Sequence, residues 1–256
     1  MILPEIDPII FQIGPIAVRW YGLTWLAAFY TIYILIKKYQ KDLNADQVND
    51  LMFYSLLGAI IGGRAGYVFF YSINQFFDNP LSIFFIWEGG LSFHGGLLGV
   101  LVACLWISRG WGVNFFWLMD RVAPFVPPGL GLVRLGNFMN SELLGRPTEM
   151  SWGVIFPSDP LGLTRHPSQL YQAIGEGILL FLYMLWVIKK PKPRMNISGH
   201  FLVGYGLIRF VTEFFRTPDQ HIGFSAFEVL TRGQLLCIPM IVIGMLLIYY
   251  SYRKQN

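Results

Sequence analysis

The residues best suited to chemistry lie between Arg134 and Arg146, in the segment RLGNFMNSELLGR. Two arginines, two asparagines, a serine and a glutamate gather here, directly after an apolar stretch that is broken by prolines and glycines. A guanidinium group can grip phosphate or carboxylate through two parallel hydrogen bonds, and an amide can both donate and accept. A polar block this dense beside an apolar segment requires water, a protein partner or a polar head group.

A second candidate is the segment GHFLVGYGLIRFVTEFFR, which places Tyr205, Arg209 and Glu213 at steps of four. Residues four apart lie on one face of a helix, so all three are expected on one stripe, with Arg216 close to it. Two interpretations stay open. The arginine and the glutamate form an ion pair that clips helices together, or the pair orients the arginine toward a ligand.

A third candidate is His94, which stands in LSFHGG. An imidazole takes up a proton near neutral pH, which is what the activation of a thiol or hydroxyl requires. The neighbouring Gly95 and Gly96 would let another segment or a ligand come close. A structural role for this histidine stays open as well.

These residues sit in a chain with the composition of a membrane protein. Of its 256 residues, 54% are hydrophobic and only 13% are charged, against about 25% charged in soluble domains. Cys104 and Cys237 fall inside apolar runs, so no disulfide is expected. The start MILPEIDPII lacks a basic region and a small-residue cleavage site, so the first span is expected to direct insertion itself.

We predict an all-α membrane protein that forms one integral domain over residues 1–256 and crosses the membrane seven times. The predicted spans are 17–36, 51–71, 91–108, 112–133, 167–188, 199–216 and 233–251. Seven spans bring every lysine to one face: Lys37, Lys38, Lys41, Lys189, Lys190, Lys192 and Lys254. By the positive-inside rule this face is cytoplasmic. The N-terminus is then outside, the C-terminus is cytoplasmic, and residues 134–166 form a small polar extracytoplasmic segment.

Nine of the twelve arginines lie outside the predicted cytoplasmic loops: Arg19, Arg64, Arg121, Arg134, Arg146, Arg165, Arg209, Arg216 and Arg232. Most of these nine map to the outer half of the membrane or its outer surface. A charge at the centre of a membrane helix costs roughly 2.5–3.5 kcal/mol on insertion scales, so such residues line cavities or pair with one another. Arginine without lysine on the outer side suggests phospholipid head groups. The alternative, strongest for Arg19, Arg165 and Arg232, is that the side chains reach to the interface.

Other chemistries find no support in the sequence. Four scattered histidines and two apolar cysteines do not form a metal-ligand set. No glycine-rich loop of the nucleotide-binding type occurs. We therefore expect no metal, no cofactor and no nucleic-acid partner.

The block from Arg134 to Gly145 closely resembles the signature of bacterial prolipoprotein diacylglyceryl transferases. The resemblance extends over nearly the whole chain, in the motifs RWYG (19–22), GGRAGY (62–67), LSFHGG (91–96), HPSQLY (166–171) and GYGLIRFVTEFFR (204–216). Two positions depart from the usual pattern. Val133 stands where the family usually has glycine, and Gln172 stands where it usually has glutamate.

The resemblance implies an enzyme of the bacterial inner membrane that moves the diacylglyceryl group of phosphatidylglycerol to the lipobox cysteine of a prolipoprotein signal peptide. A thioether forms and glycerol phosphate leaves. The implied partners are phosphatidylglycerol, prolipoprotein signal peptides and membrane lipids. The nucleophile belongs to the substrate, so the chain needs a base for the thiol and cations for the leaving phosphate.

Site roles are assigned on this basis. His94 is the expected proton acceptor, although an arginine or a carboxylate could take that role. Arg134 and Arg209 are expected to bind the phosphate, and Glu142 and Glu213 to orient the arginines. The expected substrate-binding residues, with Tyr205 shaping the pocket and Gly145 in a turn, are Tyr21, Arg64, Asn137, Asn140, Glu142, Gly145, Tyr205 and Arg216. Two other classes stay open: a transporter or flippase for anionic lipids, and a non-catalytic receptor for signal peptides.

Overall fold

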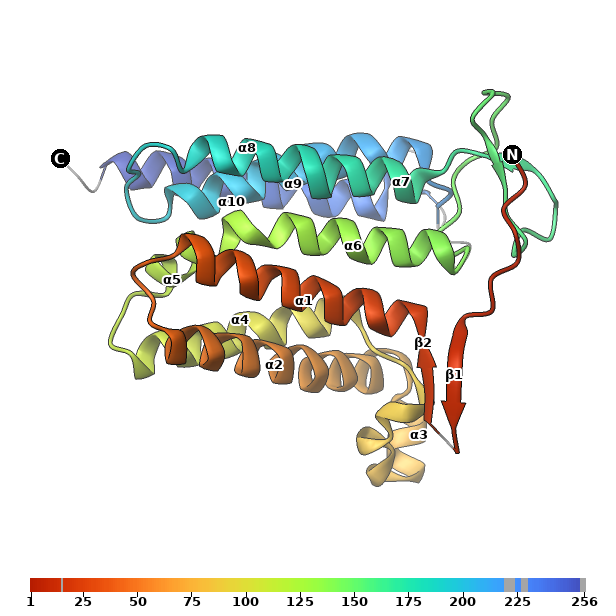
Figure 1. Ribbon diagram of the computed structural model, residues 1–256, viewed down its shortest axis with the longest axis horizontal. Coiled ribbons are helices and arrows are strands. Elements are labelled where there is room, and N and C mark those ends of the chain that lie inside the picture. Colours follow the sequence, from red (N-terminus) through yellow and green to blue (C-terminus); the bar gives the residue numbers. More distant parts are fainter. Residues whose placement is uncertain (15, 219–223, 227–229, 254–256) are drawn as a thin grey trace. The chain divides into compact units, whose positions relative to one another are not determined.

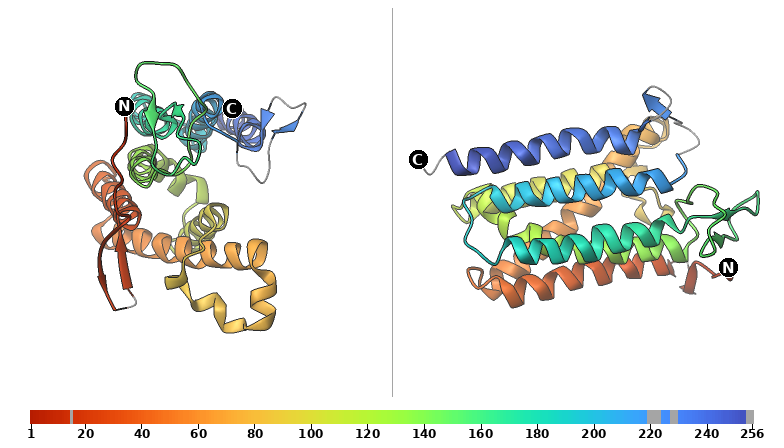
Figure 2. Two further views of the ribbon diagram at one scale, coloured as in Figure 1. Left: turned by 90° about the vertical axis from the view of Figure 1, so that its right-hand side faces the viewer. Right: turned by 90° about the horizontal axis from the view of Figure 1, so that it is seen from above.

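The structure is a computed structural model that describes residues 1–14, 16–218, 224–226 and 230–253. Helices dominate it (Figures 1 and 2). The chain divides into two compact units, one of Met1–Ile32 with Asp120–Asn256 and one of Tyr33–Met119.

The smaller unit is built on two long helices, α2 (Ala45–Tyr71) and α4 (Phe93–Gly110), which pack along each other. A capping box starts α2, because the side chains of Asn44 and Gln47 each accept a hydrogen bond from the other residue's backbone N–H. The connection between the two helices holds the short helices α3 (Ile73–Asp78), η1 (Pro80–Phe84) and η2 (Ile86–Glu88).

Glycines form the contact between α2 and α4. Gly58, Gly62 and Gly66 on α2 meet Gly95 and Gly99 on α4 so closely that the two backbones touch. A Cβ atom added at Gly58 would lie 2.5 Å from the carbonyl oxygen of Gly99. Stripes of small residues let membrane helices approach in this way. The close approach expected beside His94 therefore exists at Gly95, and the segment that comes close is α2.

The larger unit opens with the hairpin β1 (Ile9–Ile13) and β2 (Ile16–Arg19), followed by α1 (Trp20–Tyr39), whose last turns count with the smaller unit. The chain returns to this unit through α5 (Phe115–Val122), the short η3 (Ala123–Phe125) and α6 (Val126–Met139). Three prolines lie where these helices meet: Pro124, Pro127 and Pro128. Proline is tolerated there because the first turn of a helix has no partner for its N–H groups.

Three further helical segments complete the larger unit. The first is one continuous helix of α7 (Ser168–Gln172), a π-helical stretch (Ala173–Leu179) and α8 (Leu180–Val187). The other two are α9 (Asn196–Thr212), which ends in η5 (Glu213–Phe215), and α10 (Arg232–Arg253). Helix α9 packs along α10, and α6 runs antiparallel to the α7–α8 helix (Figures 1 and 2).

A small head covers the end of the larger unit where α6 stops and α7 begins (Figure 1). It contains the two-residue strands β3 (Val154–Ile155) and β4 (Thr164–Arg165). Its core of Leu3, Val154 and Phe156 packs against Phe138 and Leu144. Arg165 holds Asp159 through two hydrogen bonds of 2.8 and 2.9 Å, and these bonds lower the pKa of the Asp159 carboxyl below its ordinary value.

The helices agree with the predicted class. Four of them are long and apolar enough to cross a membrane: Ala45–Tyr71, Phe93–Gly110, Ser168–Val187 and Arg232–Arg253. Helices also occupy the other predicted spans, 17–36, 112–133 and 199–216. The number of seven crossings and their orientation stay predictions. Lys254, one of the lysines assigned to the cytoplasmic face, lies outside the described residues.

One predicted boundary is wrong. The polar segment was expected to begin at Arg134, but α6 continues to Met139 and carries Arg134 and Asn137 on its last turns. The guanidinium of Arg134 pairs with the buried carboxylate of Glu176. This pairing lowers the cost of placing the arginine charge in an apolar segment.

The glycine contact makes a prediction about stability. Gly99→Ala places a methyl group against the α2 backbone, so we expect a loss of about 1–3 kcal/mol, measured as a lower midpoint of thermal unfolding in detergent. Gly110→Ala, in the same helix, is the matched control, because a Cβ there meets nothing within 4 Å. Equal midpoints for the two variants would contradict the close contact.

Candidate active site

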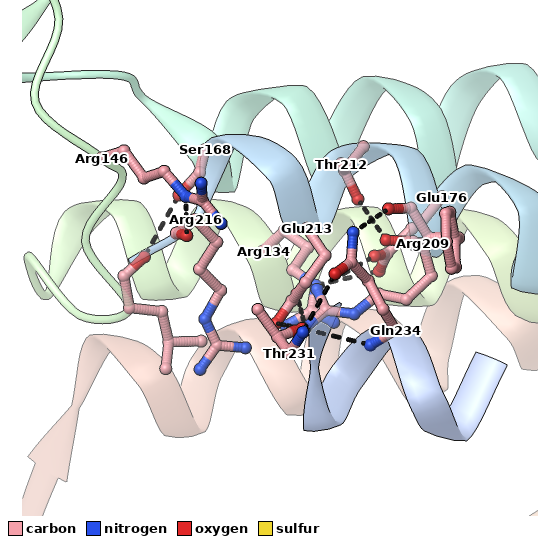
Figure 3. Close-up of polar contacts among 12 residues, drawn as sticks. Arg134, Arg146, Ser168, Glu176, Arg209, Thr212, Glu213, Arg216, Thr231 and Gln234 are labelled. Carbon is pink, nitrogen blue, oxygen red and sulfur yellow. Dashed lines mark hydrogen bonds and ion pairs between the residues drawn. The ribbon is translucent and has the colours of Figure 1, made fainter. Parts of the chain in front are cut away.

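Four charged side chains form a buried group in the larger unit, here called the quartet: Arg134, Glu176, Arg209 and Glu213 (Figure 3). Glu176 Oε2 accepts from Arg134 Nε at 3.0 Å, while its Oε1 lies 3.5 Å from Arg209 Nη1. Arg209 Nη2 lies 2.6 Å from Glu213 Oε2. The quartet thus has two cations and two anions, which allows it to lie within an apolar helix bundle.

Glu176 is central to the quartet because one carboxylate contacts both arginines. Its side chain is 0% exposed. It lies in the π-helical stretch, flanked by Gly175 and Gly177, and Gly177 touches Gly131 of α6 backbone to backbone. π-helical turns within α-helices are frequent at functional sites. The local widening and the glycine contact together bring the carboxylate between α6 and α9.

The expected ion pair between Arg209 and Glu213 is present, but the sequence analysis missed Glu176. A signal existed, because Glu176 is the only acidic residue in the predicted span 167–188. An ionisable residue inside a membrane segment is a functional candidate by default. Tyr205, expected to shape the pocket, also belongs here, since its side chain lies close enough to Arg134 and Glu176 to interact with both electrostatically.

Helix α10 supports the remaining carboxylate of the quartet. The Thr231 hydroxyl donates to Glu213 Oε1 at 3.2 Å. Thr231 is itself held by a reciprocal cap, because Gln234 N donates to its hydroxyl and Gln234 Oε1 accepts from its backbone N–H (Figure 3). The first turn of α10 lies so close to Glu213 that a Cβ atom added at Gly233 would be 2.6 Å from the Glu213 carboxylate. Glu213 therefore has a fixed position.

The asparagines of the signature segment surround Glu142. Asn137 and Asn140 donate to the two carboxylate oxygens of Glu142 at 3.2 and 3.0 Å. Ser141 and Leu143, on either side of Glu142, have φ angles of 53° and 56°, a conformation that is uncommon without glycine and marks functional sites. Glu142 was expected to orient an arginine. The carboxylates that contact Arg134 and Arg209 are instead Glu176 and Glu213.

Gly145 was expected in a turn, and this expectation is wrong. Gly145 forms an antiparallel bridge with Arg216, and its carbonyl accepts from Thr217 Oγ1 at 2.8 Å and from Arg165 Nη1 at 3.1 Å. A Cβ atom here would collide with the carbonyl of His166, so only glycine fits. Arg146 Nε donates to the Arg216 carbonyl at 3.0 Å (Figure 3). These bonds connect the signature segment to the end of α9.

Two predicted site residues, His94 and Arg64, lie in the smaller unit. His94, exposed in the first turn of α4, borders an open hollow lined by Tyr67, Tyr71, Leu91, Ser92, Phe93 and His94. Arg64 is buried, and its guanidinium donates to four backbone carbonyls of the connection between α2 and α4: Ser82, Ile83, Gly89 and Gly90. These bonds favour a structural role for Arg64 over the expected contact with substrate.

Tyr21 lies in the first turn of α1, and its ring contacts Trp25 edge to face at 6.4 Å. One turn later, Thr24 packs directly against Gly136 of α6. This contact puts Tyr21 on the flank of the helix that carries Arg134 and Asn137.

The quartet suits an anion better than a metal. Two guanidinium groups that share one carboxylate present several N–H donors in a confined, apolar region, where hydrogen bonds to an oxyanion are strong. Within the described ranges, no group of three or more His, Cys, Asp or Glu side chains could hold a metal ion.

The chain is similar to proteins of one family along nearly its whole length. A family model described as prolipoprotein diacylglyceryl transferase matches residues 8–250. Two relatives, from Pseudomonas putida and Acinetobacter baumannii, are named phosphatidylglycerol–prolipoprotein diacylglyceryl transferase. Each is 47% identical to this chain over 98% of its length, and the matched region covers 96% and 95% of the two relatives. One from Pseudomonas syringae is 46% identical. The chain therefore belongs to the prolipoprotein diacylglyceryl transferase family.

Proposed function

We propose that this protein transfers the diacylglyceryl group of phosphatidylglycerol to the lipobox cysteine thiol of prolipoproteins. Its relatives carry the names of both substrates. The observation that carries the proposal is the pair of buried guanidinium groups on Arg134 and Arg209, held by the shared carboxylate of Glu176. A buried arginine pair is a suitable site for the phosphodiester of an anionic lipid.

The reaction needs few groups from the enzyme. The thiolate sulfur attacks the glyceryl carbon that bears the phosphate ester, and a carbon–sulfur bond forms as the carbon–oxygen bond breaks. The bonding electrons leave on glycerol phosphate, which gains negative charge. Arg134 and Arg209 stabilise this charge, because preorganised donors in a dry site act most strongly where charge develops. The thiol proton passes to a base and then to solvent.

His94 is the proposed base. It is exposed in the first turn of α4, and its imidazole makes no hydrogen bond to any described residue, so its nitrogen atoms are accessible to a substrate. Glu213 is the competing candidate, because its Oε2 is buried and has close charge contact with Arg209 but no aligned hydrogen bond. The pH dependence of the two variants distinguishes these assignments.

We propose seven membrane crossings in the bacterial inner membrane, with the N-terminus outside and the reaction in the outer half. Within the larger unit, Lys189, Lys190 and Lys192 lie between α8 and α9, at the end opposite the polar head (Figure 1). Arg253 ends α10 at the same end. This separation of basic residues from the head supports a cytoplasmic and an outer end.

The proposed reaction is tested by mass. Purified protein with phosphatidylglycerol and a lipobox peptide should add one diacylglyceryl group to the peptide, through a thioether that resists hydroxylamine, with an equal amount of glycerol phosphate. A peptide with serine in place of the cysteine is the control. A flippase or a signal-peptide receptor would instead move or bind its ligand and leave the peptide mass unchanged.

Arg209→Lys tests the role of the guanidinium. Lysine keeps the charge beside Glu213 but loses the two-pronged donor, so transfer should fall about 100-fold or more while the protein stays folded. Arg19→Lys is the matched control, because Arg19 is exposed in the hairpin before α1. If Arg209 only neutralises its partner, the double variant Arg209→Gln with Glu213→Gln should be stable and active, and such a result would remove Arg209 from the site.

His94→Ala tests the base. We expect transfer at neutral pH to fall by about 10²–10⁴-fold, the usual contribution of a general base, with lipid binding retained. Raising the pH toward the thiol pKa, about 8.5 for free cysteine, should recover part of the rate because the substrate then ionises unaided. A near-normal rate at neutral pH would exclude His94, and the same profile in Glu213→Gln would favour the carboxylate.

A further inference from the structure

The contact between α6 and the α7–α8 helix has a regular antiparallel register. Gly131 meets Gly177, and Arg134 meets Glu176. Beyond the end of α6, the carbonyl of Glu142 accepts from the Gln169 side chain. Since antiparallel helices pair residues in opposite order, this register predicts that Asn137 lies at the level of Gln172, between these contacts.

Three side chains at this level, Asn137, Gln169 and Gln172, form an uncharged polar stripe, here called the amide stripe. They are 3%, 0% and 1% exposed. Among the described residues, four of their atoms have no hydrogen-bond partner: Asn137 Oδ1, Gln169 Oε1, Gln172 Oε1 and Gln172 Nε2. A buried polar atom without a partner costs about 1–3 kcal/mol, so the stripe is suited to a ligand that supplies hydrogen bonds.

Another buried glutamine of the larger unit shows the usual alternative. Gln234 is also 0% exposed, but its Oε1 accepts from Thr231 N at 3.0 Å and its Nε2 donates to the Phe210 carbonyl at 3.4 Å. Both of its polar atoms are therefore satisfied within the protein. Gln172 differs because neither its Oε1 nor its Nε2 has a hydrogen-bond partner among the described residues.

The amide stripe begins next to the proposed phosphate site. Asn137 is one turn beyond Arg134 on α6, and Gln172 is one turn before Glu176 on the facing helix. One turn is about 5.4 Å, comparable to the reach of a three-carbon alcohol from its phosphate. The stripe extends from the arginines toward the head, in the direction that a lipid head group would take.

We propose that the amide stripe recognises the hydroxyl groups of the alcohol on the far side of the phosphodiester, and so selects lipids with a polyhydroxylated head group. This inference rests on the proposed function. A hydroxyl both donates and accepts, and an amide offers N–H donors and a carbonyl acceptor to match it. Because the amide side chains are uncharged, they leave the charge balance of the neighbouring quartet unchanged.

The test compares phosphatidylglycerol with phosphatidylpropanol, which has the same phosphodiester charge and carbon count in its alcohol but no hydroxyls. Wild-type protein should prefer phosphatidylglycerol in kcat/KM for transfer to the lipobox peptide. Gln172→Met should reduce this preference by about 5- to 20-fold, the value of one or two hydrogen bonds, through slower transfer from phosphatidylglycerol alone. Gln172→Glu, which keeps an acceptor oxygen that the head-group hydroxyls can donate to, should retain most of the preference.

Gln234→Met is the matched control, and it should lower transfer from both lipids in proportion, because its amide has partners within the protein. An unchanged preference in Gln172→Met, or a proportional loss with both lipids, would overturn the inference. If the wild type forms no product from either lipid, the proposed function itself fails.

A second measurement needs no variant. Glycerol phosphate should inhibit the wild-type protein more strongly than propyl phosphate, because only the former carries hydroxyls for the amide stripe. Equal inhibition by the two phosphates would also overturn the inference.

Discussion

The larger unit depends on one carboxylate placed between two guanidinium groups. Glu176 balances the charges of Arg134 and Arg209 inside the helix bundle, and Glu213 completes a neutral set. Removal of one partner from a buried ion pair typically costs about 3–5 kcal/mol, because the other charge is left without compensation. Helices α6 and α9, the π-helical stretch and η5 must therefore keep their mutual positions. The same constraint fixes the positions of the two guanidinium groups.

Glycine is what allows the helices to meet this constraint. The backbone contact of Gly131 with Gly177 brings α6 against the π-helical stretch, and the gap at Gly233 admits the Glu213 carboxylate to the start of α10. Gly145 has the same role at the head, where it joins the signature segment to the end of α9 through Arg216. A membrane offers little hydrophobic drive between helices, so close packing and buried polar contacts must hold such a bundle together.

Much of this was open to sequence reasoning. Apolar runs of about 20 residues predict membrane helices because the bilayer sets their length, and the four-residue step from Arg209 to Glu213 predicts one face because the helix repeat is 3.6 residues. The density of polar residues from Arg134 to Arg146 predicted a site there, since such groups are costly in lipid without a role, and Arg134 is the member of this segment that belongs to the quartet. These inferences rest on local geometry and composition alone.

The tertiary structure alone decided which partners meet. Glu176 lies 42 residues from Arg134 and 33 from Arg209, and no local pattern links them; the π-helical stretch that turns its carboxylate inward also has no simple sequence signal. Arginine is a residue type that often binds phosphate head groups, yet Arg64 donates its hydrogen bonds to backbone carbonyls in the connection between α2 and α4. The sequence by itself determined the helices, the charged stripe and the family. The pairing of buried charges and amides depended on helix register, which is set by backbone contacts between glycines far apart in the chain.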